Sequence, residues 1–181
     1  MLMGEQGYRK ATAEDICGVA AIYEKIHDAE EAGAVTIGWE RGVYPVEETA
    51  RAALKRNELF VYEEGGRILA AAIINKTQVD VYAKGNWRYE ASDDEVMVLH
   101  TLVVDLDAGR GGMGSGFVKF YETYAGKCGC SVLRIDTNEK NSAARRMYGK
   151  LGYIESDMVP CVFNGIDGVN LVLLEKKLQA D

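Results

Sequence analysis

Residues 108–116, AGRGGMGSG, contain five glycines and follow the apolar stretch VMVLHTLVV after three intervening residues. Glycine has no Cβ, so consecutive backbone N–H groups can surround an anion, and the start of a following helix adds its positive end. The chemistry predicted for this loop is therefore phosphate binding. The rest of the chain must indicate which phosphate-containing ligand is bound.

The loop fits one established phosphate-binding pattern. Gly109, Gly111 and Gly114 satisfy G-x-G-x-x-G, and Asp136 lies about where the ribose-binding acid of a dinucleotide fold would stand. Two features count against this interpretation: DLDA separates Val104 from Gly109, and 108 residues precede a unit that usually comes early. A dinucleotide-dependent oxidoreductase stays open as an alternative.

The neighbours of the loop match a second pattern. The stretch LHTLVVDLDAGRGGMGSGFVKFYETYA, followed by VLRIDTNEKNSAARRMYGKLGY, resembles the acyl-CoA-binding half of the GNAT family of N-acetyltransferases. That family joins a strand through Q/R-x-x-G-x-G/A to a helix, and a later helix carries N-x-x-A-x-x-x-Y-x-x-x-G-F/Y. The matching residues here are Gly112, Met113, Gly114, Asn141, Ala144, Tyr148, Gly152 and Tyr153.

The resemblance implies that acetyl-CoA is the co-substrate and that loop N–H groups bind its pyrophosphate. It covers roughly residues 95–177, and the opening YRKATAEDICGVAAIYEKI is similar to the family's first strand and helix. The family's Q/R position falls on Gly109, with Arg110 one residue late. The residues expected to contact acetyl-CoA are Leu102, Val103, Val104, Gly109, Arg110, Gly111, Gly112, Met113, Gly114, Ser115, Asn141, Ala144 and Tyr148.

Two side chains are candidates for catalysis. The resemblance places Tyr148 where the family's general acid stands, and a phenol with a pKa near 10 suits protonation of a thiolate leaving group. Packing beside Ala144 and Leu151 is the alternative for this tyrosine. Strand alternation predicts that residues 96, 98, 100, 102 and 104 share one face, on which His100 is the only titratable group. His100 is the candidate base, with a core histidine or a water chain as alternatives.

The acceptor is expected to bind outside the acyl-CoA half. Acidic neighbours in the sequence favour a cationic amine there, on a small molecule or a peptide, whereas Asp136 is expected to cap the turn TNEKN. The aromatic residues expected to line the acceptor pocket, with core or rim packing as the alternative, are Trp39, Tyr44, Trp87 and Tyr89. The acids are Glu40, Glu90 and Asp94.

Positioning these residues requires alternating helices and strands. Apolar periodicity predicts two helices, an antiparallel hairpin, and then strand–helix–strand–helix–strand. This order predicts a GNAT-like α/β fold with a mixed, mostly antiparallel twisted sheet covered by helices on both faces. The chain is expected to form one domain over residues 1–181, with the acceptor side in 1–94 and the acyl-CoA side in 95–181.

Composition limits the remaining functions. The 181 residues are 48% apolar and 27% charged, enough for one core, and the net charge of −7 argues against a nucleic-acid surface. No secretory signal is visible, and the longest apolar run, ILAAAII, is too short to cross a membrane, so a cytoplasmic protein is expected. Four scattered cysteines predict reduced thiols and no metal site. A non-catalytic acyl-CoA sensor and a homodimer both stay open.

Overall fold

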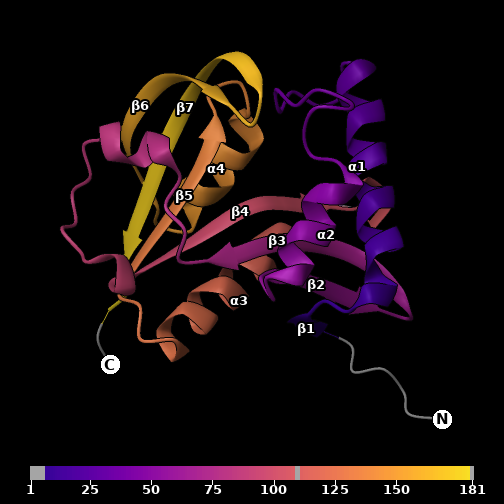
Figure 1. The fold of residues 1–181 in the computed structure, drawn as a ribbon, viewed down its shortest axis with the longest axis horizontal. Coiled ribbons are helices and arrows are strands. Elements are labelled where there is room, and N and C mark those ends of the chain that lie inside the picture. Colours follow the sequence, from indigo (N-terminus) through magenta and orange to yellow (C-terminus); the bar gives the residue numbers. More distant parts are fainter. Residues whose placement is uncertain (1–6, 109–110, 180–181) are drawn as a thin grey trace.

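A computed structural model of the chain describes residues 7–108 and 111–179. Within these residues seven strands form one sheet in the order β1-β2-β3-β4-β5-β7-β6 (Figure 1). All neighbouring strands pair antiparallel except β4 and β5, which are parallel. The strands are β1 (Gly7–Lys10), β2 (Leu59–Glu64), β3 (Arg67–Asn75), β4 (Val96–Val104), β5 (Val132–Asn138), β6 (Ile154–Phe163) and β7 (Ile166–Lys177).

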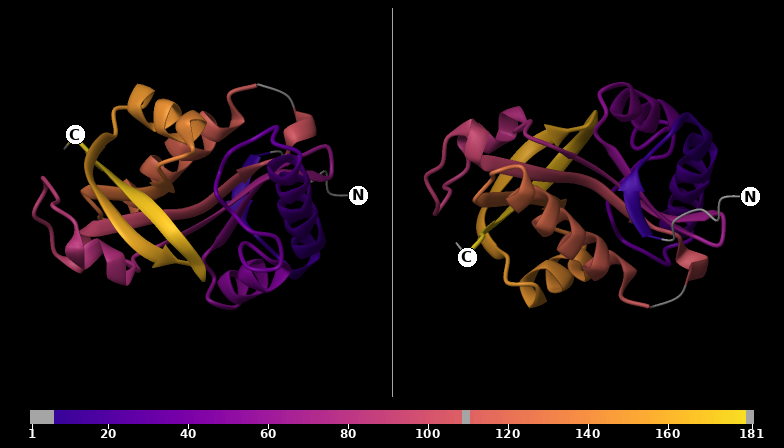
Figure 2. Two further views of the ribbon diagram at one scale, coloured as in Figure 1. Left: turned by 90° about the horizontal axis from the view of Figure 1, so that it is seen from above. Right: turned by 90° about the horizontal axis from the view of Figure 1, so that it is seen from below.

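Four α-helices cover the two faces of the sheet in the described part of the chain. Helices α1 and α2 lie on one side, and α3 and α4 lie on the other (Figure 2). None of these helices is long and apolar enough to span a bilayer. The helices are α1 (Ile16–Glu31), α2 (Glu47–Lys55), α3 (Met113–Lys127) and α4 (Ser142–Lys150), with short 3-10 turns at Ala13–Asp15, Asp80–Lys84, Asp93–Glu95 and Leu106–Ala108.

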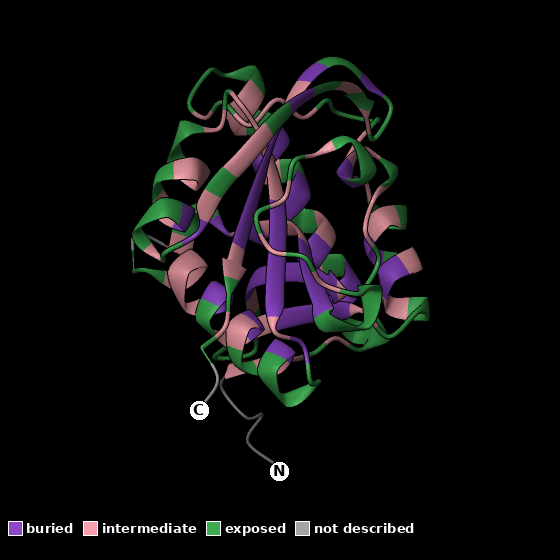
Figure 3. Ribbon diagram, turned by 90° about the vertical axis from the view of Figure 1, so that its left-hand side faces the viewer, coloured by how far each residue is buried: buried purple, intermediate pink, exposed green. Residues whose placement is uncertain are grey.

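The alternation of β3 shows how one strand serves both layers. Ala70, Ala72 and Ile74 pack with the buried side chains of α3, whereas Ala71 and Ile73 pack with those of α1. The small side chains of Ala70, Ala71 and Ala72 let both helices approach the sheet closely. Buried residues accordingly follow the central strands (Figure 3). The predicted fold class, a mixed and mostly antiparallel sheet with helices on both faces, is confirmed.

Strand β4 departs from the alternation that the sequence predicts. Thr101 has φ of 51°, and the ladder with β3 shifts there, because His100 is opposite Ile73 while Val103 is opposite Ala71. Such a bulge inserts one extra residue and reverses the side-chain parity beyond it. Leu102 and Val104 therefore pack toward α3, and the prediction that they share a face with residues 96, 98 and 100 is wrong.

Strands β4 and β5 separate after a short parallel ladder. They pair only from Val96 opposite Val132 to Leu99 opposite Ile135. Beyond this point β4 pairs only with β3, and residues 136–138 of β5 pair only with β7. Figure 1 shows the two strands diverging. The backbone of residues 102–104 is thus left with an open edge.

Candidate active site

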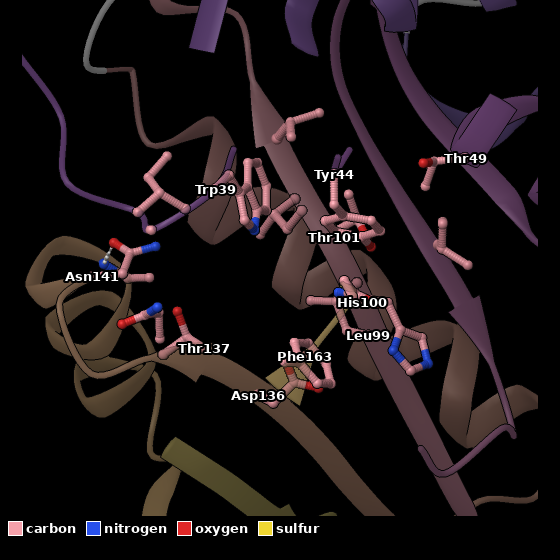
Figure 4. A pocket seen from close by; sticks show the side chains of 18 of the residues that line it. Trp39, Tyr44, Thr49, Leu99, His100, Thr101, Asp136, Thr137, Asn141 and Phe163 are labelled. Atoms are coloured by element: carbon pink, nitrogen blue, oxygen red, sulfur yellow. Dashed lines mark hydrogen bonds between the residues drawn. The ribbon is translucent and has the colours of Figure 1, made fainter. Parts of the chain in front are cut away.

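A cavity of about 560 Å³ lies where β4 and β5 separate (Figure 4). One part of its wall is the open edge of β4 with the start of α3 and the inner face of α4. The other part comes from the loop before α2, from β5 and from the β6–β7 hairpin. The lining residues used below are Trp39, Tyr44, Arg56, Asn75, His100, Thr101, Leu102, Val103, Val104, Gly114, Asp136, Asn141, Ala144, Met147, Tyr148, Phe163, Ile166, Val169 and Leu171.

The start of α3 provides an anion site made of backbone. Gly112 precedes the helix with φ of 74°, a left-handed conformation that favours glycine. The first helical hydrogen bond runs from Gly116 N–H to the Gly112 carbonyl at 2.8 Å. The N–H groups of Met113, Gly114 and Ser115 therefore have no acceptor within the helix and project from its positive end. The expected contacts of Gly109 and Arg110 lie outside the described residues.

Gly114 lets α3 approach the other two elements of this wall. A Cβ at this position would lie 3.1 Å from Met147 Sδ and 3.7 Å from Val104 Cγ2. Gly114 lines the cavity together with Leu102, Val103 and Val104, four of the residues predicted to contact acetyl-CoA. Gly111, Gly112, Met113 and Ser115 are at the adjoining helix start but are not part of the lining.

The Asn141 motif positions Tyr148. Asn141 is the N-cap of α4, and its Oδ1 accepts a hydrogen bond from Ala144 N–H at 3.1 Å. Tyr148 follows two helical turns later, so it projects from the same side of α4. All three residues line the cavity.

Tyr148 is buried, with 5% of its surface exposed. Burial, and secondarily the charge of Asp136, raise the pKa of Tyr148 above the ordinary phenol value. No hydrogen bond holds its hydroxyl within residues 7–108 and 111–179. The phenol is therefore protonated at neutral pH and free to donate to a group in the cavity.

His100 reaches the cavity from the β3 side of β4 (Figure 4). Its Nε2 lies 3.0 Å from Asn75 Oδ1, and the Asn75 amide donates to Glu58 Oε2 at 3.0 Å. Burial lowers the pKa of His100 to about 4. The imidazole is therefore neutral near pH 7, and it binds protons weakly.

Two of the four aromatic residues predicted for the pocket line the cavity. Trp39 and Tyr44 meet edge to face with ring centroids 6.0 Å apart, and the Tyr44 hydroxyl is hydrogen-bonded to Thr101. Their loop is fixed to α1 because Glu30 accepts hydrogen bonds from Ile37 N–H and Gly38 N–H at 2.6 and 2.9 Å. This wall is therefore anchored to β4 through Thr101 and to α1 through Glu30.

The other two aromatic residues lie away from the cavity, contrary to the prediction. The Trp87 ring covers the Arg134 guanidinium at 4.0 Å, and Trp87 Nε1 donates to the Tyr82 carbonyl at 2.8 Å. Tyr89 accepts a hydrogen bond from Arg134 through its carbonyl at 3.2 Å. Both residues help to cover a buried cation. The acids Glu40, Glu90 and Asp94 do not line the cavity either.

Asp136 lies in the cavity wall, where the sequence interpretation did not place it. It is opposite Leu173 within the β5–β7 ladder, so it cannot cap the turn, and Asn138 Oδ1 accepts from Lys140 N–H instead. Its carboxylate accepts a hydrogen bond from the Tyr82 hydroxyl at 2.7 Å, and burial raises the pKa of Asp136 to about 6. Strand alternation puts Asp136 on the opposite face of β5 from the buried Leu133 and Ile135, and this pattern could have predicted its position from the sequence.

The topology excludes the dinucleotide interpretation. A dinucleotide fold needs a doubly wound, mostly parallel sheet, whereas β4 and β5 form the one parallel pair in the described ladders. Asp136 is also inside its strand rather than at the end of it. The described residues contain no group of three or more His, Cys, Asp or Glu that could hold a metal ion.

Comparison with solved structures gives the fold an independent reference. A GNAT-family acetyltransferase from Streptococcus agalactiae 2603 matches with a TM-score of 0.76 at 21% identity, covering 96% of this chain and 95% of that one. The ribosomal-protein-alanine N-acetyltransferase from Brucella melitensis matches with 0.69 at 19% identity, over 94% and 99%. The yncA protein of Salmonella typhimurium, solved with its cofactor acetyl-CoA, matches with 0.64 at 18% identity, over 96% and 94%.

These identities support similarity of fold. A search of the curated proteins found no significant match. The model of the acetyltransferase (GNAT) family, in contrast, matches residues 19–153, which span α1 through α4 and include both motifs. The chain therefore belongs to the GNAT family of acetyltransferases.

Proposed function

We propose that this chain moves the acetyl group of acetyl-CoA to a primary amine by direct transfer in a ternary complex. The observation that carries the proposal is the cavity itself. It joins the open β4 edge and the α3 N-terminus, both backbone surfaces, to a chamber lined by side chains from a loop, β5 and the β6–β7 hairpin. Two substrates can thus meet at one point from different sides.

The backbone surfaces fit acetyl-CoA chemically. The amides of the pantetheine arm can bind the open edge at Leu102, Val103 and Val104 as an added strand would. The pyrophosphate fits the free N–H groups of Met113, Gly114 and Ser115, where the helix end also favours negative charge. An N–H near Val103 or Val104 would polarise the thioester carbonyl.

Tyr148 is the proposed general acid. Tyr148 lines the cavity, and its hydroxyl makes no hydrogen bond with a described residue, so it can protonate the departing thiolate. His100, which the sequence offers as the base, and Asp136 are the two lining side chains that could accept the amine proton. No cysteine belongs to the lining that the structure describes, which favours direct transfer over an acyl-enzyme.

Ligand-induced stabilisation tests the co-substrate. Acetyl-CoA at a hundredfold over its Kd should raise the free energy of unfolding by about 2.7 kcal/mol, whereas NADPH should leave it unchanged. Thiol release with a panel of primary amines then tests transfer. Stabilisation without thiol release for any amine would favour an acyl-CoA sensor, and stabilisation by NADPH alone would overturn the proposal.

A further inference from the structure

Asp136 stands out among the residues of the cavity because its charge has no cationic partner. It is the one carboxylate in the described lining, and none of the ion pairs between described residues includes it. The groups that face it are phenols and a thiol: Tyr44 before α2, Tyr82 in the Asp80–Lys84 turn, Tyr148 on α4 and Cys161 on β6. An anion in such surroundings lacks the partner that would offset its desolvation.

We propose that Asp136 binds the ammonium group of the acceptor and accepts its proton, and that the acceptor is a small primary amine on an apolar body. This inference rests on the proposed acetyl transfer and names its substrate class and base. A cationic amine would supply the missing partner of Asp136. Asp136 and Tyr148 both line the cavity, so the proton acceptor and the proposed acid border the same space.

The alternative base is less well placed. His100 projects toward β3 and is hydrogen-bonded to Asn75, whereas Asp136 projects from β5 on the other side of the cavity (Figure 4). The pKa of His100, about 4, makes its imidazole a weaker base than the Asp136 carboxylate, whose pKa is about 6. Geometry and basicity thus both favour Asp136.

The charges around the cavity restrict the rest of the acceptor. Arg56 is the only Lys or Arg in the described lining, and its Nε already donates to Glu58 Oε2 at 2.8 Å. The one cation of the described lining is thus already paired with an acid, which disfavours an acceptor that carries a carboxylate. A single acid likewise provides for one ammonium group, which disfavours polyamines.

The walls around Asp136 indicate an apolar body for the acceptor. The lining residues Phe163, Ile166, Val169 and Leu171 belong to one apolar cluster of β6 and β7, and Tyr82, which holds Asp136, is part of it. Predominantly apolar walls with a small number of polar groups that fix orientation are typical of small-molecule sites.

The transfer balances with these groups. The acceptor ammonium gives one proton to the Asp136 carboxylate, and the neutral nitrogen attacks the thioester carbonyl carbon. The C–N bond forms, the C–S bond breaks with its electron pair on sulfur, and the thiolate takes the Tyr148 proton. The Tyr148 phenolate then takes the surplus proton of the new amide nitrogen, and Asp136 releases its proton to water. One ammonium and one thioester give one amide, one thiol and one proton.

The test compares Asp136→Asn with the wild-type protein and with Glu90→Gln, which removes the same charge from an exposed loop. Calorimetry measures 2-phenylethylamine binding without acetyl-CoA, and thiol release gives kcat/KM. For Asp136→Asn we expect amine binding at least about tenfold weaker and kcat/KM about 100-fold lower, with acetyl-CoA affinity within a factor of about two. Glu90→Gln should match the wild type in all three measurements.

The chemical class of the acceptor is tested separately. We expect use at least about tenfold less efficient than that of 2-phenylethylamine for three other acceptors: phenylalanine, putrescine and a peptide amino terminus. The reason is that the described lining offers no unpaired charged partner for their additional polar groups. Equal or better use of the peptide would overturn the small-molecule assignment.

Each remaining outcome bears on one claim. Normal amine binding and turnover by Asp136→Asn would overturn the role of Asp136 alone, whereas absence of thiol release by the wild type with every amine would overturn the proposed function. Should Asp136→Asn not fold, Tyr82→Phe keeps the carboxylate but removes the hydrogen bond that it accepts. That hydrogen bond lowers the pKa of Asp136, so its loss should raise this pKa. We then expect the acid limb of the pH profile to move to higher pH, and an unmoved limb would contradict the proposal.

Discussion

The two sides of the cavity differ in what they are made of. The side assigned to acetyl-CoA consists mainly of backbone: an unpaired strand edge at Leu102–Val104 and the N–H groups that follow Gly112. The side that we assign to the acceptor consists of side chains, chiefly Trp39, Tyr44 and Asp136, from elements far apart in the sequence. A backbone site tolerates sequence change as long as the chain path persists. A side-chain site can change its ligand through single substitutions.

Tyr148, the proposed general acid, should give the largest effect. Tyr148→Phe should lower kcat by about 10²- to 10⁴-fold, because the thiolate then leaves without a proton donor. The acetyl-CoA Kd should stay nearly unchanged, since the phenyl ring keeps its packing. Steady-state kinetics and direct acetyl-CoA titration make the measurement, and weakened binding with unchanged kcat would show a packing role only.

Bulk on the backbone side tests whether that side depends on close approach. Gly114→Leu should weaken acetyl-CoA binding about 10- to 100-fold, because its side chain would enter the space between Val104 and Met147. Gly149→Leu is the matched control, since a Cβ there meets nothing within 4 Å. Equal affinities for the two variants would argue against a close backbone approach at Gly114.

The sequence predicted the backbone side better than the acceptor side, for a physical reason. Motif spacing fixes local structure, so the helix that carries Ala144 and Tyr148 and the glycine start of α3 could be predicted from neighbours along the chain. The place of Asp136 depends instead on the pairing of β5 with β7 and on where the distant Tyr82 lies. Trp87 was misassigned because its partner Arg134 is nearly fifty residues away.

Stability against pH tests the burial of the acceptor-side acid. The pKa of Asp136 is raised to about 6, so the folded protein binds more protons than the unfolded chain and loses stability as pH rises from about 4 to about 6. Asp136→Asn removes this loss. The free energy of unfolding of Asp136→Asn should therefore exceed that of the wild type by up to about 3 kcal/mol at pH 8, and by less at pH 4. Denaturant titration at both pH values decides this, and a wild type favoured more at pH 8 would contradict it.

The smallest expected effect is on the side of β4 that faces β3. His100 has a pKa of about 4, so its titration lies below the pH range in which the enzyme would be assayed. His100→Ala should leave the shape of the kcat/KM profile between pH 5 and 8 unchanged. Loss of a limb in this range would restore His100 as the proton acceptor and weaken the contrast between the two sides.

The bulge at Thr101 gives the length of β4 a meaning of its own. The extra residue lies between His100, opposite Ile73, and Val103, opposite Ala71, so deleting Thr101 would restore a regular ladder and leave Leu102, Val103 and Val104 in their present layers. The deletion would instead remove the local bend and twist that a bulge adds to a strand, beside the point where β4 separates from β5. In this strand a deletion would therefore change the path of the open edge rather than the layer that each side chain joins.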